Sequence, residues 1–142
     1  MESKIRVATI TNTFSNQIKR ESENNAAHIG ITRMQARIIY KVYEITKYRE
    51  VFQKDIEEEY DIRRASATGI LKLMEKNNLI KREAVEYDAR LKKIILTDKA
   101  IALLEQIENN ARLFEERLTQ GISKEELAFL YSIIEKMSKN LG

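Results

Sequence analysis

The sequence contains no cysteine, no proline and no tryptophan, and only one histidine, His28, among its 142 residues. Without cysteine there can be no disulfide framework, thiolate metal site or thiol redox sensor. One histidine leaves little basis for a zinc or iron centre, and a serine–histidine catalytic pair would have to use it. These absences count against most classes of enzyme, and we expect no catalytic residues, no metal and no cofactor.

Long hydrophobic runs are also missing. No apolar stretch approaches the roughly 18 residues that a membrane span needs, and residues 1–6 lack the apolar core of a signal peptide. A composition of 43% hydrophobic and 33% charged residues is ordinary for a folded helical protein. We therefore expect one cytoplasmic domain spanning residues 1–142, with no membrane partner.

The net charge of +3 is small, but the charge is unevenly distributed. Residues 61–96 hold nine Lys or Arg and five acidic residues, so this segment carries +4 and the rest of the chain about −1. A concentration of positive charge in one short segment is what a surface that contacts phosphates requires. A basic face that is merely solvated remains an alternative on charge alone.

The hydrophobic pattern predicts helices joined by short turns. Helices are expected over residues 5–25, 32–48, 52–59, 62–77, 97–118 and 123–141, with capping boxes at Thr32-x-x-Gln35 and Ser123-x-x-Glu126. Short apolar runs at 79–80 and 94–96, separated by a turn around residues 86–88, predict a β-hairpin. The expected fold class is mainly α with a small hairpin. A winged helix-turn-helix lobe covers about 32–97, with N- and C-terminal helices flanking it.

The helix predicted at 62–77 has one apolar face and one polar face. Arg64, Thr68 and Lys72 are spaced four residues apart, so they lie along one line, with Arg63 and Ser66 beside it. Arginine can bond guanine in the major groove, and Ser or Thr can bond either base type. Gly69, in the middle of this helix, suggests either close approach to a groove wall or a packing constraint. A solvated face is the alternative for the whole line.

The predicted hairpin, residues 81–96, adds a second set of basic residues. Lys81 and Arg82 open it, Arg90 lies at its tip, and Lys92 and Lys93 leave it. An arginine on a hairpin tip can enter the narrow minor groove, while the other four would contact phosphates or support the wing. Asp88 could fix the tip by accepting a charge-assisted bond from Arg82 or Arg90. An exposed turn with ordinary charges is the alternative.

At these residues the sequence resembles the MarR family of multiple-antibiotic-resistance regulators. Residues 62–82 look like the family's recognition helix and first wing strand. Asp88-Ala89-Arg90 matches its D-x-R signature, and residues 96–100 resemble its L-T-x-x-G junction. Two positions depart from the pattern. Asn78 replaces a usual glycine but tolerates the left-handed conformation that this turn needs, and Ala100 replaces a glycine where a helix starts.

The resemblance implies an obligate homodimer whose terminal helices, about 5–25 and 98–141, interlock while two lobes read a pseudo-palindrome in double-stranded DNA. The last helix agrees with this expectation, because it carries an apolar stripe formed by Leu127, Leu130, Ile133, Ile134, Met137 and Leu141. A lone terminal helix would not leave such a stripe in water. Packing of the stripe within the monomer is the alternative.

The resemblance also implies a small aromatic or phenolic effector, bound between the dimer base and the DNA-binding lobe. Candidate contacts are an arginine and several ring side chains: Phe14, His28, Arg37, Tyr40 and Tyr43. An aromatic pocket with one cation would suit such a ligand. The alternative is that most of these residues belong to the core or to an interface.

The leading hypothesis is a homodimeric transcriptional repressor that binds a pseudo-palindromic operator and performs no catalysis. The alternative is a winged-helix protein–protein adaptor that does not bind DNA and uses its acidic segment, residues 55–59, to contact a partner. Binding to duplex DNA at low salt separates the two.

Overall fold

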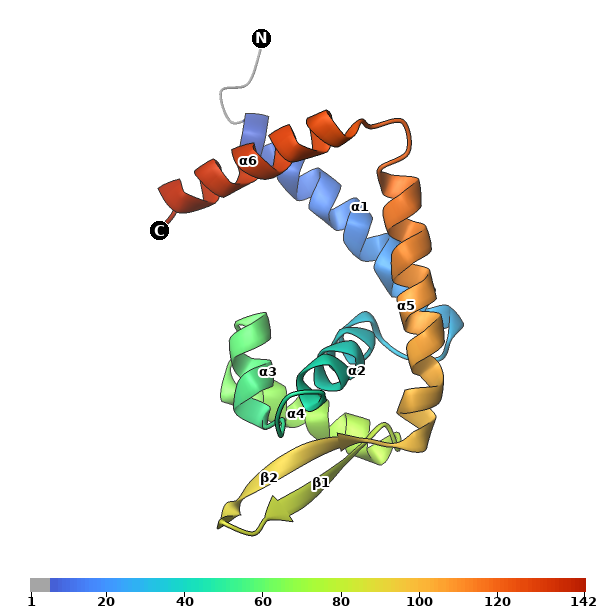
Figure 1. The fold of residues 1–142 in the computed structure, drawn as a ribbon, viewed down its shortest axis with the longest axis vertical. Helices are drawn as coiled ribbons and strands as arrows, with labels where there is room; N and C mark the ends of the chain where they lie inside the picture. The colour runs from blue at the N-terminus through green and yellow to red at the C-terminus, as the bar shows by residue number, and fades with distance from the viewer. Residues whose placement is uncertain (1–5) are drawn as a thin grey trace. The chain divides into compact units, whose positions relative to one another are not determined.

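A computed structural model describes residues 6–142 and shows helices with one antiparallel hairpin (Figure 1). The elements are α1 (Arg6–His28), α2 (Arg33–Thr46), α3 (Gln53–Tyr60), α4 (Arg64–Lys76), β1 (Ile80–Val85), β2 (Asp88–Leu96), α5 (Asp98–Leu118) and α6 (Lys124–Asn140). This order confirms the expected fold class, a mainly helical chain with a helix-turn-helix followed by a wing.

Several boundaries differ from the prediction. Helix α1 continues to His28, which was expected in the connection after the helix, and the predicted start at Ile5 lies outside the described residues. Helix α4 begins at Arg64 because Arg63 has an extended backbone and occupies the N-cap. The strands are longer than the apolar runs that predicted them, because backbone pairing continues through the polar residues of the wing.

The predicted helix starts are confirmed by their hydrogen bonds. The Thr32 hydroxyl accepts from the Gln35 backbone N–H at 3.1 Å, and the Gln35 side chain accepts from the Thr32 N–H at 3.0 Å. Ser123 and Glu126 repeat this reciprocal arrangement before α6. Such caps satisfy backbone donors that the first helical turn leaves free. Short sequence signals therefore mark these two helix starts correctly.

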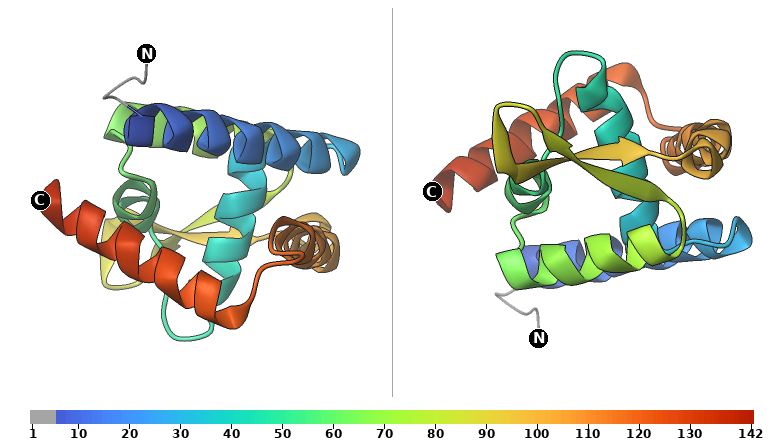
Figure 2. Two further views of the ribbon diagram at one scale, coloured as in Figure 1. Left: turned by 90° about the horizontal axis from the view of Figure 1, so that it is seen from above. Right: turned by 90° about the horizontal axis from the view of Figure 1, so that it is seen from below.

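The chain divides into two compact units, one ending at Asn109 and the other running from Asn110 to Gly142. The first unit holds the hydrophobic core, to which α2, α3, α4 and the hairpin all contribute. Its most deeply buried side chains are Ile38, Ile39, Val42, Val51, Ile56, Leu71, Met74 and Leu79. In the view from below, α2 passes behind the hairpin and runs toward α4 (Figure 2), which agrees with the central place of its side chains in the core.

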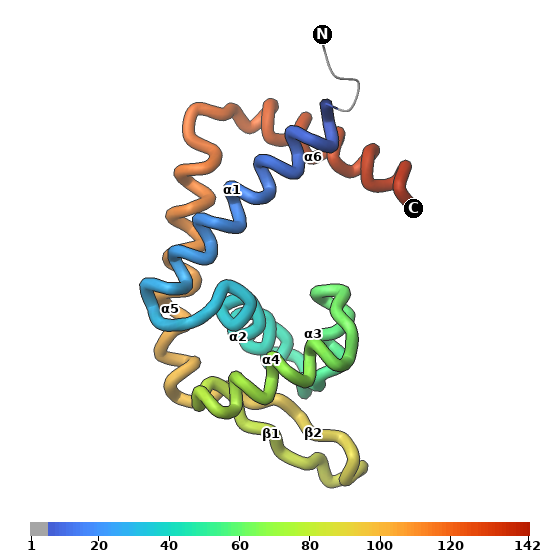
Figure 3. Tube along the Cα trace, turned by 180° about the vertical axis from the view of Figure 1, so that it is seen from behind, coloured from blue at the N-terminus to red at the C-terminus, as the bar shows by residue number. Residues whose placement is uncertain are grey.

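A backbone hydrogen bond ties the hairpin to the segment between α2 and α3. Strand β1 pairs with β2 from Ile80 opposite Leu96 outward, with an irregularity between Ala84 and Val85. The N–H of Ile94 donates to the Val51 carbonyl at 2.7 Å, so β2 also bonds the segment between α2 and α3. Figure 3 traces the two strands projecting away from α2. The wing is thus an extension of the core at its base.

Asn78 has the left-handed backbone conformation that its position was expected to need, with φ of 58°. In this conformation the next N–H, that of Leu79, reaches back to the Met74 carbonyl at 2.9 Å and closes α4. The Asn78 carbonyl then accepts a bond from the Thr97 hydroxyl at 2.7 Å. The end of α4 and the start of α5 are therefore joined.

The second unit comprises the end of α5 and the whole of α6. No residue of α6 is buried, and the side chains of its apolar stripe are half-buried or exposed, including Leu130, Ile134 and Met137. None of the helices within residues 6–142 is long and apolar enough to span a membrane.

Candidate DNA interface

The outer face of α4 carries most of the residues that were expected in the major groove. Arg63, Arg64, Ser66 and Lys72 are all exposed, whereas Ala67, Leu71 and Met74 are buried on the opposite face. Gly69 also lies on this outer face, and a Cβ atom added there would meet no atom within 4 Å. Packing within the described chain therefore does not explain the glycine. The outer face is basic, with small side chains at its middle.

Thr68 is placed differently from Arg64 and Lys72. It is half-buried at the border of the outer face, and its hydroxyl accepts a hydrogen bond from the Gln53 side chain at 2.9 Å. Gln53 is the first residue of α3, so this bond connects the two helices of the helix-turn-helix. The expected line of three side chains therefore has two exposed ends and a middle member held from inside.

Arg82, on β1, contacts the same glutamine, Gln53. Its Nη2 donates to Gln53 Oε1 at 2.6 Å, its Nε lies 3.9 Å from Glu75 Oε1, and its side chain is only 19% exposed. These contacts match a wing-supporting residue and leave little of the side chain for a phosphate. The structure thus joins β1, α3 and α4 through Gln53, a residue that the sequence pattern did not single out because its partners lie 15 and 29 positions away.

At the tip of the wing, Asp88 and Arg90 form one of the two pairings that the sequence suggested for Asp88. Asp88 Oδ1 accepts from the Arg90 backbone N–H at 2.9 Å and from Arg90 Nε at 3.3 Å. Arg90, and not Arg82, is therefore the partner of Asp88. The Arg90 side chain remains 92% exposed, so it projects from a turn whose backbone the carboxylate holds in place. Lys81 and Lys92 are also exposed on the wing.

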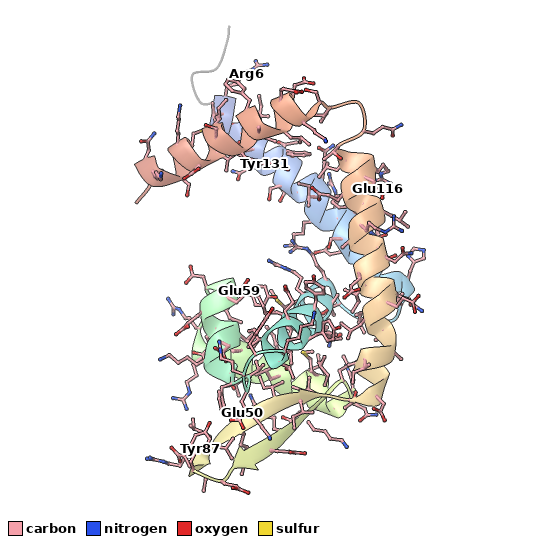
Figure 4. All side chains as sticks on the ribbon, in the orientation of Figure 1. Arg6, Glu50, Glu59, Tyr87, Glu116 and Tyr131 are labelled. Atoms are coloured by element: carbon pink, nitrogen blue, oxygen red, sulfur yellow. The ribbon has the colours of Figure 1, made fainter. Side chains whose placement is uncertain are left out.

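A second contact holds the wing tip against the segment between α2 and α3. The Tyr87 hydroxyl donates to Glu50 Oε2 at 2.9 Å (Figure 4). This bond, together with the nearby negative charge, raises the pKa of Tyr87 above its ordinary value. Lys93 Nζ lies 4.0 Å from the other Glu50 oxygen, so this predicted basic residue faces an acid of the same chain. No local sequence signal pairs Tyr87 with Glu50, because the two residues are 37 positions apart.

The acidic helix α3 is partly neutralised by the chain itself. Arg49 donates two hydrogen bonds to Asp55, at 3.0 and 2.8 Å, and the Phe52 N–H donates a third at 2.9 Å. The bond with Arg49 is the main reason that the pKa of Asp55 lies below its ordinary value. Glu59 lies 3.2 Å from Lys41 on α2. These acids therefore help to hold α3 in the lobe.

The five candidate effector residues have separate contacts. The Arg37 guanidinium lies 4.7 Å from the Tyr60 ring centre, and Lys47 lies 4.5 Å from that of Tyr43. His28 Nδ1 is 2.7 Å from the Asn24 carbonyl oxygen, within its own helix. Phe14 and Tyr40 are partly exposed. The contacts of Arg37, Tyr43 and His28 thus lead to three different partners and do not assemble a common site.

One further cation near Arg37 was missed by the sequence reading. The buried Nε of Arg33 has no hydrogen-bond partner within the described chain. Burial, followed by repulsion from Arg37 one turn along α2, lowers the pKa of Arg33. The spacing of four residues could have identified this pair of like charges.

A helix-turn-helix with a basic second helix and an arginine-tipped hairpin defines the winged-helix class of proteins. Residues 29–91 match the family model described as MarR family. A crystal structure of the transcription regulator MarR from Oenococcus oeni PSU-1 is 31% identical, covering 94% of this chain and 98% of that one, with a TM-score of 0.77. The chain belongs to the MarR family of transcriptional regulators.

Two other solved structures extend the comparison. The S. aureus MepR–DNA complex shares the fold at a TM-score of 0.88 and 21% identity, covering 99% of this chain and all of that one. The heme sensor protein PefR from Streptococcus agalactiae, in complex with heme, has a TM-score of 0.69 and 25% identity, covering 99% of this chain and 95% of that one.

Proposed function

We propose that the protein is a homodimeric repressor that reads a pseudo-palindromic operator in double-stranded DNA. The observation that carries this proposal is that α4 and the wing belong to one compact unit and both expose basic side chains: Arg63, Arg64 and Lys72 on the helix, and Lys81, Arg90 and Lys92 on the wing. A helix of this kind fits the major groove, and an exposed arginine suits the narrow minor groove.

The proposed division of labour follows exposure and pairing. Arg63, Arg64, Ser66, Thr68 and Lys72 contact base edges or phosphates in the major groove, and Arg90, shaped by Asp88, enters the minor groove. Lys81 and Lys92 contact phosphates. Arg82 and Lys93 support the wing, because Gln53 and Glu50 already hold or face them.

Dimerisation is supported by apolar side chains that the single chain leaves exposed. Besides the stripe of α6, helix α1 exposes Val7, Ile10 and Phe14 to about half of their area or more. Exposed apolar surface of this extent is typical of an interface between subunits. Two lobes in a symmetric dimer would present their recognition helices to successive major grooves about 34 Å apart.

The decisive experiment is fluorescence anisotropy with labelled random duplex DNA at low salt, repeated as salt is raised. We expect binding whose affinity falls steeply with salt, because bound phosphates release counterions. No binding even at low salt would favour the alternative, a protein–protein adaptor. The pairing of Asp55 with Arg49 and of Glu59 with Lys41 counts against an adaptor surface on α3.

The proposal includes a small aromatic effector whose binding releases the repressor from DNA. The support is the buried Arg33 Nε, which has no hydrogen-bond partner in the described chain and therefore favours an anion. Arg37, one turn along α2, lies over the Tyr60 ring. The solved PefR structure contains heme, which shows that one similar protein takes a small molecule. Titrating benzoate and phenol into the protein–DNA complex tests this part. Release of DNA by the wild type, but not by Arg37→Ala, is the expected result.

A further inference from the structure

The Gln53 side chain can adopt only one hydrogen-bonding orientation in its cluster. Arg82 has donors and no acceptor, so the Gln53 atom that faces it at 2.6 Å must be the carbonyl oxygen. The amide nitrogen then faces Thr68 Oγ1 at 2.9 Å and the Arg64 carbonyl oxygen, which can only accept, at 3.3 Å. The donor Arg82 and the acceptor carbonyl of Arg64 therefore require the same orientation of the amide. The ambiguity that usually attends glutamine amides is therefore removed.

This orientation dictates the role of the Thr68 hydroxyl. Because Gln53 Nε2 is a donor, the Thr68 oxygen must accept from it, and the hydroxyl proton points elsewhere. Other helical threonines use that proton within the helix: Thr11, Thr13 and Thr46 each donate to the carbonyl four residues earlier, at 2.6 to 3.0 Å. In the part of the chain that the structure describes, Thr68 makes no such bond to Arg64, whose carbonyl faces Gln53.

The position of Thr68 gives the remaining proton a direction. Thr68 is half-buried at the border of the outer face of α4, and the residues one turn away on either side, Arg64 and Lys72, are exposed. Gln53 takes up the accepting capacity of the hydroxyl on one side. Because Thr68 borders the exposed outer face, its proton can be donated toward a ligand of α4.

We propose that Gln53 is a positioning residue for DNA recognition, holding the Thr68 hydroxyl so that its proton is donated to an acceptor of the bound duplex. This inference rests on the proposed function and specifies one contact of it. The acceptor belongs to one of two sets, a base edge in the major groove (guanine O6 or N7, adenine N7, thymine O4) or a phosphate oxygen. Gln53 itself need not touch the DNA.

The proposal has a test in Gln53→Glu, which reverses the polarity of the hydroxyl. A carboxylate accepts from Arg82 as the amide does, but it has no proton for Thr68 or for the Arg64 carbonyl. Thr68 must then donate to the carboxylate and would turn its lone pairs toward the DNA. The substitution should not disturb folding, since it keeps the size of the side chain and an acid is favourable in the first turn of a helix.

The experiment compares four proteins: wild type, Gln53→Glu, Thr68→Val and the double variant. Thr68→Val keeps a β-branched side chain of the same shape and removes only the hydroxyl, so it serves as the matched control. Each protein selects from a pool of 30-base-pair duplexes with a randomised centre, and its affinity for the duplex that the wild type prefers is measured by anisotropy. Circular dichroism and thermal unfolding verify that all four fold.

If the acceptor is a base, Gln53→Glu changes the selected base at one position per half-site toward cytosine or adenine, which present a donor in the major groove. If it is a phosphate, affinity falls equally for all sequences. In either case the loss of affinity caused by Gln53→Glu should be about tenfold greater with Thr68 present than in the Thr68→Val background. That factor is the scale of one polar contact. The repulsion of the added charge cancels in this comparison.

Equal losses in both backgrounds, with unchanged base preference, would overturn the positioning role while leaving DNA binding intact. A wild-type protein that binds none of the duplexes would overturn the proposed function as well. The two failures are therefore distinguishable.

Discussion

Replacing Gly69 with alanine should stabilise the protein and weaken its binding to DNA. Glycine inside a helix costs about 0.5–1 kcal/mol relative to alanine. The added Cβ would meet no atom within 4 Å in the free chain, so nothing offsets this gain. For a chain of about 150 residues, 1 kcal/mol raises the melting temperature by about 2–4 °C. Thermal unfolding without DNA measures this part.

The effect on DNA binding should have the opposite sign. Gly69 lies on the outer face of α4 among the proposed contacts, where an extra methyl group would separate the helix from the groove. Losing the equivalent of one contact costs about 1–3 kcal/mol, or about 5- to 150-fold in affinity. Anisotropy with the preferred duplex at fixed salt measures it.

Ala65→Gly is the matched control, because it lowers helix propensity on the same exposed face without adding an atom. If affinity simply follows helix stability, Ala65→Gly weakens binding and Gly69→Ala strengthens it. If the close approach is real, Gly69→Ala weakens binding although it stabilises the fold. A more stable Gly69→Ala protein that binds DNA as tightly as the wild type would refute our account of this glycine.

Three further predictions address the wing, the lobe and the interface between subunits. Arg90→Ala should weaken DNA binding by about 1–3 kcal/mol in anisotropy and leave folding nearly unchanged, because its ion pair with Asp88 is exposed; unaltered affinity would contradict the wing assignment. The depressed pKa of Asp55 means that its stabilisation is complete above the ordinary carboxyl pKa and is lost as pH falls through the folded value, below about pH 4. Denaturation should therefore show a gap between wild type and Asp55→Asn at neutral pH that closes in acid, and a gap independent of pH would exclude this linkage. Ile134→Glu should convert the proposed dimer to a monomer in sedimentation experiments, whereas an unchanged mass would place the interface elsewhere.

The parts of the fold that short-range chemistry controls could be predicted from the sequence. Both capping boxes and the left-handed Asn78 are determined by side chains within four residues of the backbone they serve. Asp88 and Arg90, two residues apart, likewise form the predicted pair. At this range the sequence leaves few alternative partners.

The contacts that shape the candidate interface from within could not be predicted in the same way. Gln53 bonds Thr68 and Arg82, and Tyr87 bonds Glu50, only because the core brings α3 and the hairpin together. A glutamine at the start of a helix, or a tyrosine in a turn, carries no periodic signal that identifies its distant partner. The sequence therefore predicted which residues are basic, but not that Arg82 and Lys93 contact polar groups of the same chain.

The backbone bond from Ile94 to Val51 has a mechanical consequence. With β2 bonded to the α2–α3 segment at its base and Tyr87 bonded to Glu50 near its tip, the wing is restrained at two points against the helix-turn-helix. We therefore expect the lobe to move as one body, so that a displacement that lifts α4 from its proposed place in the major groove also lifts Arg90 from the minor groove. We expect insertion of a single base pair between half-sites to remove both sets of contacts together, so that loss of binding is abrupt rather than gradual.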